Sequence, residues 1–263
     1  MEKRAECIAF SNYKGGTGKT TSCLSIAGYL AKSNKKVLVV DFDPQANATS
    51  GLGIDAMTLR HTMYNTVLYQ CEGYEGVPIT DIILDTGFEN IHLAPSEFDL
   101  SVAELILQQM QKKVFVLDHI LEKIKELYDF ILIDLPSSPG TLSLNGLCAA
   151  DHLIISLDPC IYSIEALDNI KTTFRSIRSL ARHSINKVSA VLIRYKTPGI
   201  FRRKNPSQEV EMQLKEMFGD VFVIPEDSAI YEAQKAGVPI SHHAANSRAG
   251  KAYEKIAKNI ISE

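Results

Sequence analysis

A short run of glycine, lysine and threonine near the amino terminus constrains this chain more than any other feature. The run Lys14-Gly-Gly-Thr-Gly-Lys-Thr20 follows the apolar stretch Cys7–Phe10 and precedes a helical pattern. A strand, a glycine-rich loop and a Gly-Lys-Thr at a helix start make a nest of backbone N–H groups that binds phosphates. Lys19 would then reach the terminal phosphates, and the Thr20 hydroxyl would be placed for Mg²⁺. The sequence therefore predicts a nucleoside triphosphate site.

The start of this loop departs from the general pattern. Tyr13 stands where the first glycine is expected, and a second lysine, Lys14, opens the motif. The Lys14 ammonium cannot easily fold back onto phosphates bound by its own loop. This position suggests a cation that is offered across a dimer interface, as an arginine finger is offered in trans.

Three ordered motifs carry a resemblance to a known family. Residues Lys14–Thr21 are similar to the deviant Walker A motif of the ParA/MinD group of P-loop ATPases. Val39–Thr49 resembles switch I of the ParA/Soj branch, and Phe130–Pro136 resembles its Walker B strand. The resemblance extends over residues 5–260. It implies a P-loop NTPase fold of the deviant Walker A type, slow hydrolysis of ATP with Mg²⁺, an ATP-dependent homodimer and a ParB-like partner that stimulates hydrolysis.

The resemblance also implies roles for single residues. Asp43 matches the switch I aspartate that positions the attacking water, and it joins Lys14 and Lys19 as a predicted catalytic residue. Asp41 and Asp134 would hold the Mg²⁺ shell through waters, beside Thr20. The predicted ATP-binding residues are Lys14, Gly15, Gly16, Thr17, Gly18, Lys19, Thr20, Thr21 and Pro225.

The residues themselves leave alternatives open for these carboxylates. Asp41 and Asp43 follow a strand with Phe42 between them, so strand alternation points both to the same side. Either of them could simply cap a helix. Asp134 ends an apolar strand, where a carboxylate is costly unless a cation or hydrogen-bond donors satisfy it. Mg²⁺ provides that reason.

The choice of base rests on weaker signals. The guanine-binding pattern Asn-Lys-x-Asp is missing, because Asn186-Lys187 continues as Val188-Ser189, and ATP is favoured over GTP. Pro225 resembles the family segment that lies against adenine. A proline that ends a strand is also unremarkable on structural grounds alone.

Apolar runs alternate with helical patterns along the chain. Strands are expected near residues 6–11, 36–42, 90–95, 129–135, 151–158, 187–195 and 221–224. Helices are expected near 20–33, 99–127 with a break, 141–150, 163–185, 206–218, 228–236 and 248–261. The apolar strands are typical of a sheet covered on both faces. We predict one domain over residues 1–263, an α/β fold with a doubly wound, mostly parallel sheet and helices on both faces. Residues 50–90, the least regular part, are expected to form an insertion near the nucleotide.

Composition agrees with a cytoplasmic enzyme. The five cysteines form no C-x-x-C pair, so they indicate small buried hydrophobic residues rather than a zinc site or disulfide framework. We expect no secretory signal and no transmembrane segment, because no apolar stretch is long enough. With the resemblance, this predicts a cytoplasmic, nucleoid-associated protein.

Charge is segregated along the chain. Between Ile170 and Gln208 there are ten Lys and Arg residues and no Asp or Glu. The rest of the chain, with 18 basic and 31 acidic residues, carries a net charge of −13. A basic stripe at helical spacing suits the backbone of double-stranded DNA, bound without sequence preference, although a solvated helix face remains the alternative. The predicted DNA-binding residues are Lys171, Arg175, Arg178, Arg182, Arg202, Arg203 and Lys204.

Three function classes remain open from the sequence. The leading one is an ATP-switched dimer that partitions chromosomes or plasmids. The second is a MinD-like positioning ATPase on a membrane or other surface. The segments Arg194-Tyr195 and Ile224–Asp227 look more like the MinD branch than the ParA branch. However, residues 252–261 suggest a helix that docks on the protein, not a membrane-binding one. The third, an iron–sulfur carrier or reductase of the same superfamily, is disfavoured because paired cysteines are missing.

Overall fold

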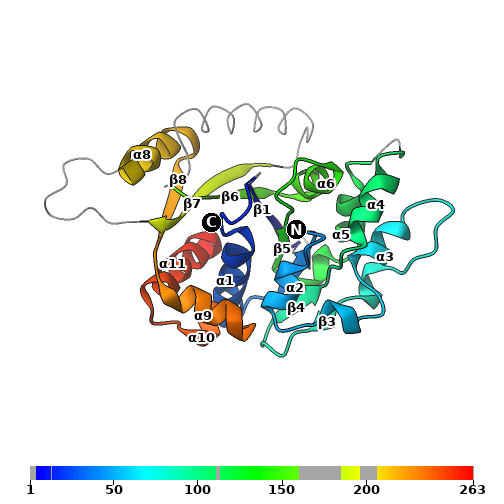
Figure 1. The fold of residues 1–263 in the computed structure, drawn as a ribbon, viewed down its shortest axis with the longest axis horizontal. Helices are drawn as coiled ribbons and strands as arrows, with labels where there is room; N and C mark the ends of the chain where they lie inside the picture. Colours follow the sequence, from blue (N-terminus) through cyan, green and yellow to red (C-terminus); the bar gives the residue numbers. More distant parts are fainter. Residues whose placement is uncertain (1–3, 13, 111–112, 160–184, 196–205, 263) are drawn as a thin grey trace, which may run out of the picture.

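The computed structural model describes residues 4–12, 14–110, 113–159, 185–195 and 206–262 (Figure 1). These residues form an eight-stranded sheet in the order β3-β4-β2-β5-β1-β6-β7-β8. All neighbouring strands pair in parallel except β3 and β4, which are antiparallel. The strands are β1 (Glu6–Ser11), β2 (Val37–Asp41), β3 (Leu84–Asp85), β4 (Ile91–Ala94), β5 (Phe130–Asp134), β6 (His152–Leu157), β7 (Lys187–Tyr195) and β8 (Asp220–Pro225).

The helices follow the strands, as in a doubly wound fold. The α-helices are α1 (Lys19–Lys32), α2 (Asn47–Gly51), α3 (Met63–Leu68), α4 (Leu100–Leu107), α5 (Val116–Glu122), α6 (Thr141–Ala149), α8 (Pro206–Phe218), α9 (Ser228–Ala236), α10 (Ile240–His243) and α11 (Arg248–Ser262). Short 3₁₀ turns occupy Ala56–Thr58, Ile79–Asp81 and Lys125–Leu127. The expected strands and helices are confirmed within a few residues, and the helix expected over 163–185 lies almost wholly outside the described residues.

Side-chain alternation along the strands builds two cores, one on each face of the sheet. On β1, Cys7 and Ala9 pack into the core shared with α3, α4, α5 and α6, whereas Ile8 and Phe10 pack into the core shared with α1, α9, α10 and α11. Because both faces are covered, the central strands are mainly apolar, and Asp41 and Asp134 stand only at the ends of β2 and β5. The predicted fold class is confirmed.

The carboxyl-terminal helix docks as expected. Helix α11 lies beside α1 (Figure 1) and buries Tyr253, Ile256 and Ile260 in the second core. Four of the cysteines, Cys7, Cys23, Cys71 and Cys148, are buried thiols, in agreement with their predicted role; Cys160 lies outside the described residues. No described helix is both long and apolar enough to cross a membrane.

Residues 50–90, which we expected to form an insertion near the nucleotide, lie only partly in that place. Helix α2 lies against α1 and lines the pocket described below, but helix α3 packs against α4 and α5. Antiparallel β3 then closes the edge of the sheet beside β4. Most of residues 50–90 therefore extends the sheet and its first core, and only its first residues lie near the phosphate-binding loop.

Candidate functional site

The candidate site lies where the central strands end. In the register of the sheet, Asp134 of β5 is level with Phe10 of β1 and with Asp41 of β2. The glycine-rich loop follows β1 directly and leads into α1. Parallel strands thus bring the three predicted motifs to one edge of the sheet, at the switch point where ligands of doubly wound folds bind.

The backbone of the loop has the shape of a phosphate-binding nest. Gly16 and Gly18 have φ values of 74° and 77°, which residues with a Cβ adopt rarely. Three hydrogen bonds hold the turn. The Lys14 N–H donates to Oδ1 of Asn12 at 3.0 Å, and the Thr17 hydroxyl donates to the Lys14 carbonyl at 3.1 Å. The Asn12 amide in turn donates to the carbonyl of Ser156, at the end of β6.

Lys19 lies inside the site. Its side chain is buried, and Nζ donates a 2.7 Å hydrogen bond to the hydroxyl of Ser137, on the loop after β5. Burial lowers the pKa of the Lys19 ammonium, and the carboxylates of Asp134 and Asp43 oppose that shift. These carboxylates favour the charged form of the buried amine, so Lys19 can bind an anionic phosphate as a cation.

The pair Thr20 and Asp134 fits a magnesium site. The Thr20 hydroxyl donates to Oδ2 of Asp134 at 2.6 Å, while Oδ1 of this buried carboxylate has no hydrogen-bond partner in the described part of the chain. Burial, reinforced by Asp41, raises the pKa of Asp134 well above its ordinary value. A buried oxygen without a donor is costly, and hard cations such as Mg²⁺ prefer hydroxyl and carboxylate oxygens. The donor set therefore fits the ion.

Asp41 is occupied by the chain itself. Its carboxylate accepts hydrogen bonds from the Thr49 N–H and hydroxyl, both at 2.7 Å, and from the Asp43 N–H at 3.3 Å. Burial raises the pKa of Asp41 to about 6, although the bonds from Thr49 oppose the shift. Because Thr49 belongs to the short helix α2, these contacts resemble those of a capping carboxylate. The magnesium role of Asp41 stays a prediction.

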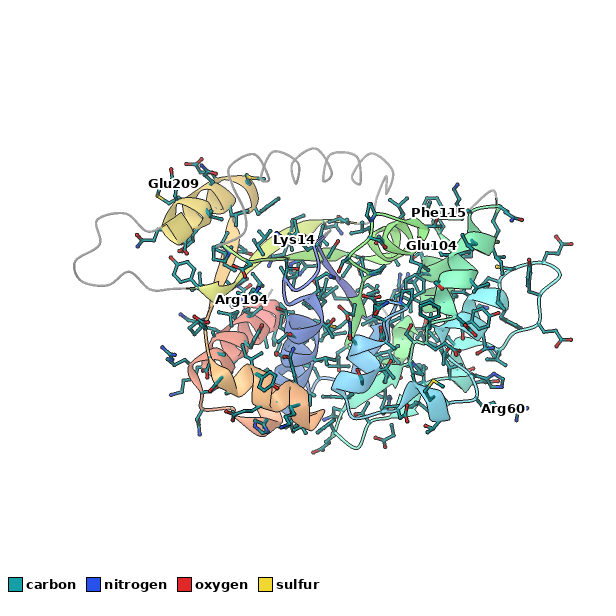
Figure 2. The ribbon with its side chains drawn as sticks, in the orientation of Figure 1. Lys14, Arg60, Glu104, Phe115, Arg194 and Glu209 are labelled. Atoms are coloured by element: carbon teal, nitrogen blue, oxygen red, sulfur yellow. The ribbon has the colours of Figure 1, made fainter. Side chains whose placement is uncertain are left out.

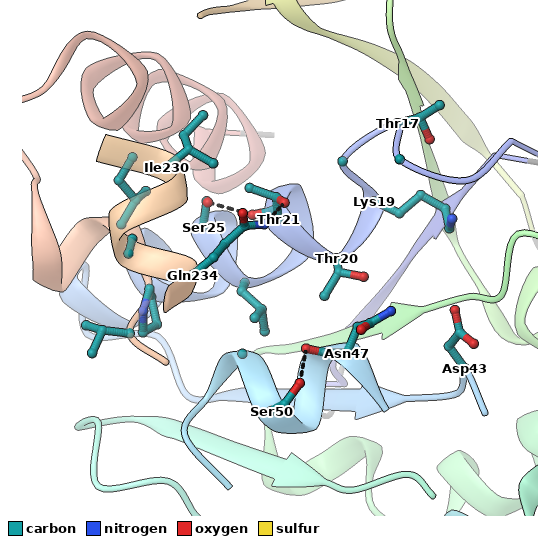
Figure 3. A pocket seen from close by; sticks show the side chains of 18 of the residues that line it. Thr17, Lys19, Thr20, Thr21, Ser25, Asp43, Asn47, Ser50, Ile230 and Gln234 are labelled. Atoms are coloured by element: carbon teal, nitrogen blue, oxygen red, sulfur yellow. Dashed lines mark hydrogen bonds between the residues drawn. The ribbon is translucent and has the colours of Figure 1, made fainter. Parts of the chain in front are cut away.

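Asp43 lines the nucleotide side of the site, although its side chain is largely buried. It lines a pocket of about 430 Å³, and Figure 3 shows it at the same end of this pocket as Lys19 and Thr20, with Ile230 and Gln234 at the other end. Oδ1 of Asp43 accepts a hydrogen bond from the Gln45 N–H at 3.0 Å. The carboxylate is thus held at the phosphate end of the pocket.

A second pocket of about 590 Å³ adjoins the first and contains Pro225. The walls shared by both pockets are Gly16, Gly18, Thr21, Ile230 and Gln234. The Gln234 amide donates to the Thr21 hydroxyl at 2.7 Å, so α9 is tied to the start of α1 between them. The first pocket lies over the phosphate loop, and the second runs toward Pro225. A nucleotide could place its phosphates in the first and its base in the second.

The structure brings most of the predicted nucleotide residues together. Gly16, Thr17, Gly18, Lys19, Thr20 and Thr21 line the first pocket, whereas Lys14 and Gly15 are exposed on the loop outside it. All seven predicted DNA-binding residues lie outside the described residues. Two other basic residues of the same segment are described, and both form ion pairs, Lys187 with Asp220 and Arg194 with Asp158.

Sequence reasoning missed four residues that shape this site. Ser137 directly follows the predicted Walker B segment Phe130–Pro136, and Asn12 lies two residues before Lys14, so position alone was a usable signal for both. Arg194 was noted only for the resemblance of Arg194-Tyr195 to the MinD branch, and Gln234 carries no local signal. They reach the loop only because α9 and the end of β7 pack against it.

Comparisons with known proteins agree with this geometry. A family model described as "AAA domain" matches residues 5–187. The chain is similar to the chromosome-partitioning ATPase Soj of Treponema pallidum, with 36% identity over 97% of this chain and 96% of that protein. It is also similar to an ATP complex of McdA from Cyanothece (TM-score 0.84, 22% identity, 99% of this chain and 97% of that one). Cobyrinic acid a,c-diamide synthase of Mycobacterium smegmatis, bound to an ATP analogue and magnesium, has a TM-score of 0.80 and 25% identity, over 98% of this chain and 94% of that one.

Proposed function

The chain belongs to the ParA/MinD family of P-loop ATPases, and we propose that it is a nucleotide-switched dimer that partitions DNA. It is an ATPase, with ATP and Mg²⁺ as its ligands. The relative Soj is a chromosome-partitioning ATPase by name, and it aligns with nearly the whole chain. Partitioning, DNA binding, the ParB-like partner and a place on the nucleoid are our proposals.

The residues of the pocket divide the work of hydrolysis. The loop N–H groups and the Lys19 ammonium bind the phosphates and offset charge that develops on them. Thr20 and Asp134 would hold Mg²⁺, which screens the same charge when it is bound. Asp43, at the phosphate end of the pocket, would orient the attacking water. Positioning and charge stabilisation account for most catalysis of phosphoryl transfer, and this pocket supplies both.

The contrast between the two lysines of the loop supports the dimer most directly. Lys19 is buried and hydrogen-bonded to Ser137, whereas Lys14 is exposed at the mouth of the same loop. Figure 2 shows the Lys14 side chain on the loop after β1. A lysine at that position can reach the phosphates of a second subunit that faces it. Hydrolysis would then end the association, so that the ATPase acts as a timer.

We propose that the ATP-bound dimer binds DNA. The basic segment between Ile170 and Gln208 contains ten cations and no acid in an otherwise acidic chain. A dimer doubles the phosphate contacts of one subunit, and affinity depends steeply on their number because each neutralised phosphate adds about 0.9 to the salt slope. Binding would be independent of sequence and strong only in the ATP state.

A gel-shift on random-sequence duplex DNA tests this function. Wild-type protein should bind with ATP and bind weakly or not at all with ADP or without nucleotide. The double variant Arg178→Glu with Arg203→Glu should lose DNA binding but keep ATP-dependent dimerisation. The matched control Lys123→Glu with Lys235→Glu makes the same charge change at exposed lysines outside the segment and should bind normally.

Two results would contradict the proposal. One is unchanged DNA affinity and salt slope in the Arg178→Glu, Arg203→Glu protein. The other is ATP-dependent sedimentation with anionic lipid vesicles in the absence of any DNA binding, which would favour a membrane-positioning ATPase.

A further inference from the structure

The end of strand β7 forms one wall of the phosphate loop. The register of β7 against β8 shifts between Leu192 and Tyr195, and within this irregular stretch Arg194 has a φ of 50°. Left-handed backbone is costly for a residue with a Cβ, and it persists only where the surroundings demand it. Such outliers gather at functional sites, so the contacts of Arg194 need a reason.

Two neighbouring residues of β7 touch two glycines of the loop. A Cβ added to Gly18 would meet Cδ1 of Ile193 at 3.0 Å, so the side chain of Ile193 packs directly on this glycine. Next to it, the Arg194 guanidinium donates a 3.0 Å hydrogen bond to the Gly16 carbonyl. In Figure 2, Arg194 lies where β7 ends, beside α11 and α1. The bulge and the left-handed residue together turn the guanidinium onto the loop.

A buried carboxylate fixes the guanidinium in place. Arg194 forms an ion pair with Asp158, whose side chain is only 4% exposed and which directly follows strand β6. A planar guanidinium with several donors can bind a carboxylate and a carbonyl at once, which a single ammonium does less well. Asp158 therefore orients Arg194, and Arg194 connects the end of β6 to the loop.

We propose that Arg194 is a positioning residue that sets the phosphate loop for nucleotide binding. The C=O and N–H of a trans peptide point in opposite directions. Holding the Gly16 carbonyl on Arg194 therefore aims the N–H of Thr17 the other way, into the loop. The loop is then preorganised before nucleotide arrives, and this role concerns the ATP site whether or not the protein partitions DNA.

Calorimetric titration of nucleotide tests this role. In Arg194→Gly, which accepts the left-handed backbone, the dissociation constants for a non-hydrolysable ATP analogue, ADP and magnesium tripolyphosphate should all rise by about tenfold or more. The value of kcat at saturating ATP should fall by less than the affinities do, because the loop N–H groups already contact the phosphates in the ground state. Arg194→Lys keeps the charge beside Asp158 and should show the same pattern to a smaller degree.

The control is Lys187→Ala, which removes the 3.1 Å ion pair with Asp220 at the opposite end of β7 and should leave all three affinities unchanged. Tripolyphosphate has no base, so a loss for the ATP analogue and ADP but not for tripolyphosphate would overturn the proposal and assign Arg194 to the base pocket. Unchanged affinities in both Arg194 variants would also overturn it. If Arg194→Gly is unstable, Arg194→Lys decides the matter alone.

Discussion

The Thr20 hydroxyl donates a 2.6 Å hydrogen bond to one oxygen of Asp134, and the other oxygen of that carboxylate is buried without a partner in the described part of the chain. The hydroxyl keeps the carboxylate in line with the start of α1. The remaining oxygen is the one that would face a cation or its water. The same feature that readies the site for Mg²⁺ therefore costs stability in the nucleotide-free protein.

Asp134→Asn should separate these two effects. The raised pKa of Asp134 reflects the cost of burying its ionised form, which an amide does not carry, so near neutral pH the nucleotide-free protein should gain about 1–3 kcal/mol of unfolding free energy in urea. Magnesium-dependent ATP hydrolysis should be lost, because the carboxylate oxygen for the cation is gone. Asp81→Asn, at an exposed acid far from the loop, should change neither quantity. A variant that is destabilised, or that keeps wild-type hydrolysis, would contradict the assignment of Asp134.

Asp43→Ala and Lys19→Ala should fail in different ways. Asp43→Ala removes the carboxylate from the phosphate end of the pocket but leaves the loop intact, so hydrolysis should slow by about 100-fold with ATP affinity retained. Lys19→Ala removes the buried cation and should lose affinity for the nucleotide itself. Equilibrium binding and single-turnover hydrolysis, measured side by side, distinguish the two. Normal hydrolysis by Asp43→Ala would place the water-orienting role elsewhere.

Asp41 should make the nucleotide-free protein less stable as pH rises. Burial raises the pKa of Asp41 from 3.8 to about 6, so between these values the folded chain holds a proton that the unfolded chain has released. Stability from this group is therefore lost as pH rises through that window, by at most about 3 kcal/mol. The free energy of unfolding in urea should be measured at several pH values for wild type and for Asp41→Asn. The difference between the two proteins should show this slope. A difference that is flat across the window would show that Asp41 is ionised normally.

The sequence predicted the parts of the site that local pattern determines. The loop Lys14–Thr21, the strand-ending Asp134 and the docking helix near the carboxyl terminus all follow from glycine spacing, apolar runs and helical periodicity. Parallel pairing then brings the ends of β1, β2 and β5 together, which topology alone dictates.

The remaining features depend on tertiary contacts that no local pattern encodes. Arg194 reaches Gly16 only through a bulge in β7, and Gln234 reaches Thr21 only because α9, which packs against α2 and α10, lies beside the start of α1. The short pairing of β3 with β4 was not predicted, because two residues give no periodicity. Likewise, the alternation that points Asp41 and Asp43 to one side does not reveal that Thr49 occupies the carboxylate of Asp41.

Lys14 carries the central claim, a dimer in which each subunit completes the site of the other. Lys14→Ala should keep nucleotide affinity, because its side chain is exposed outside the pocket, but should lose hydrolysis. Asp43→Ala should also keep nucleotide affinity and lose hydrolysis, because it lacks the carboxylate that orients the attacking water. Each variant alone is therefore expected to be nearly inactive.

Mixing the two inactive variants tests the claim most directly. In a mixed dimer, the subunit carrying Lys14→Ala retains Asp43 and receives Lys14 from its partner, so one of its two sites is complete. Random pairing at equal concentrations should then restore roughly a quarter of the wild-type steady-state ATPase rate. If Lys14 acts only within its own subunit, no dimer contains a complete site, and a mixture that stays as inactive as its components would contradict the account.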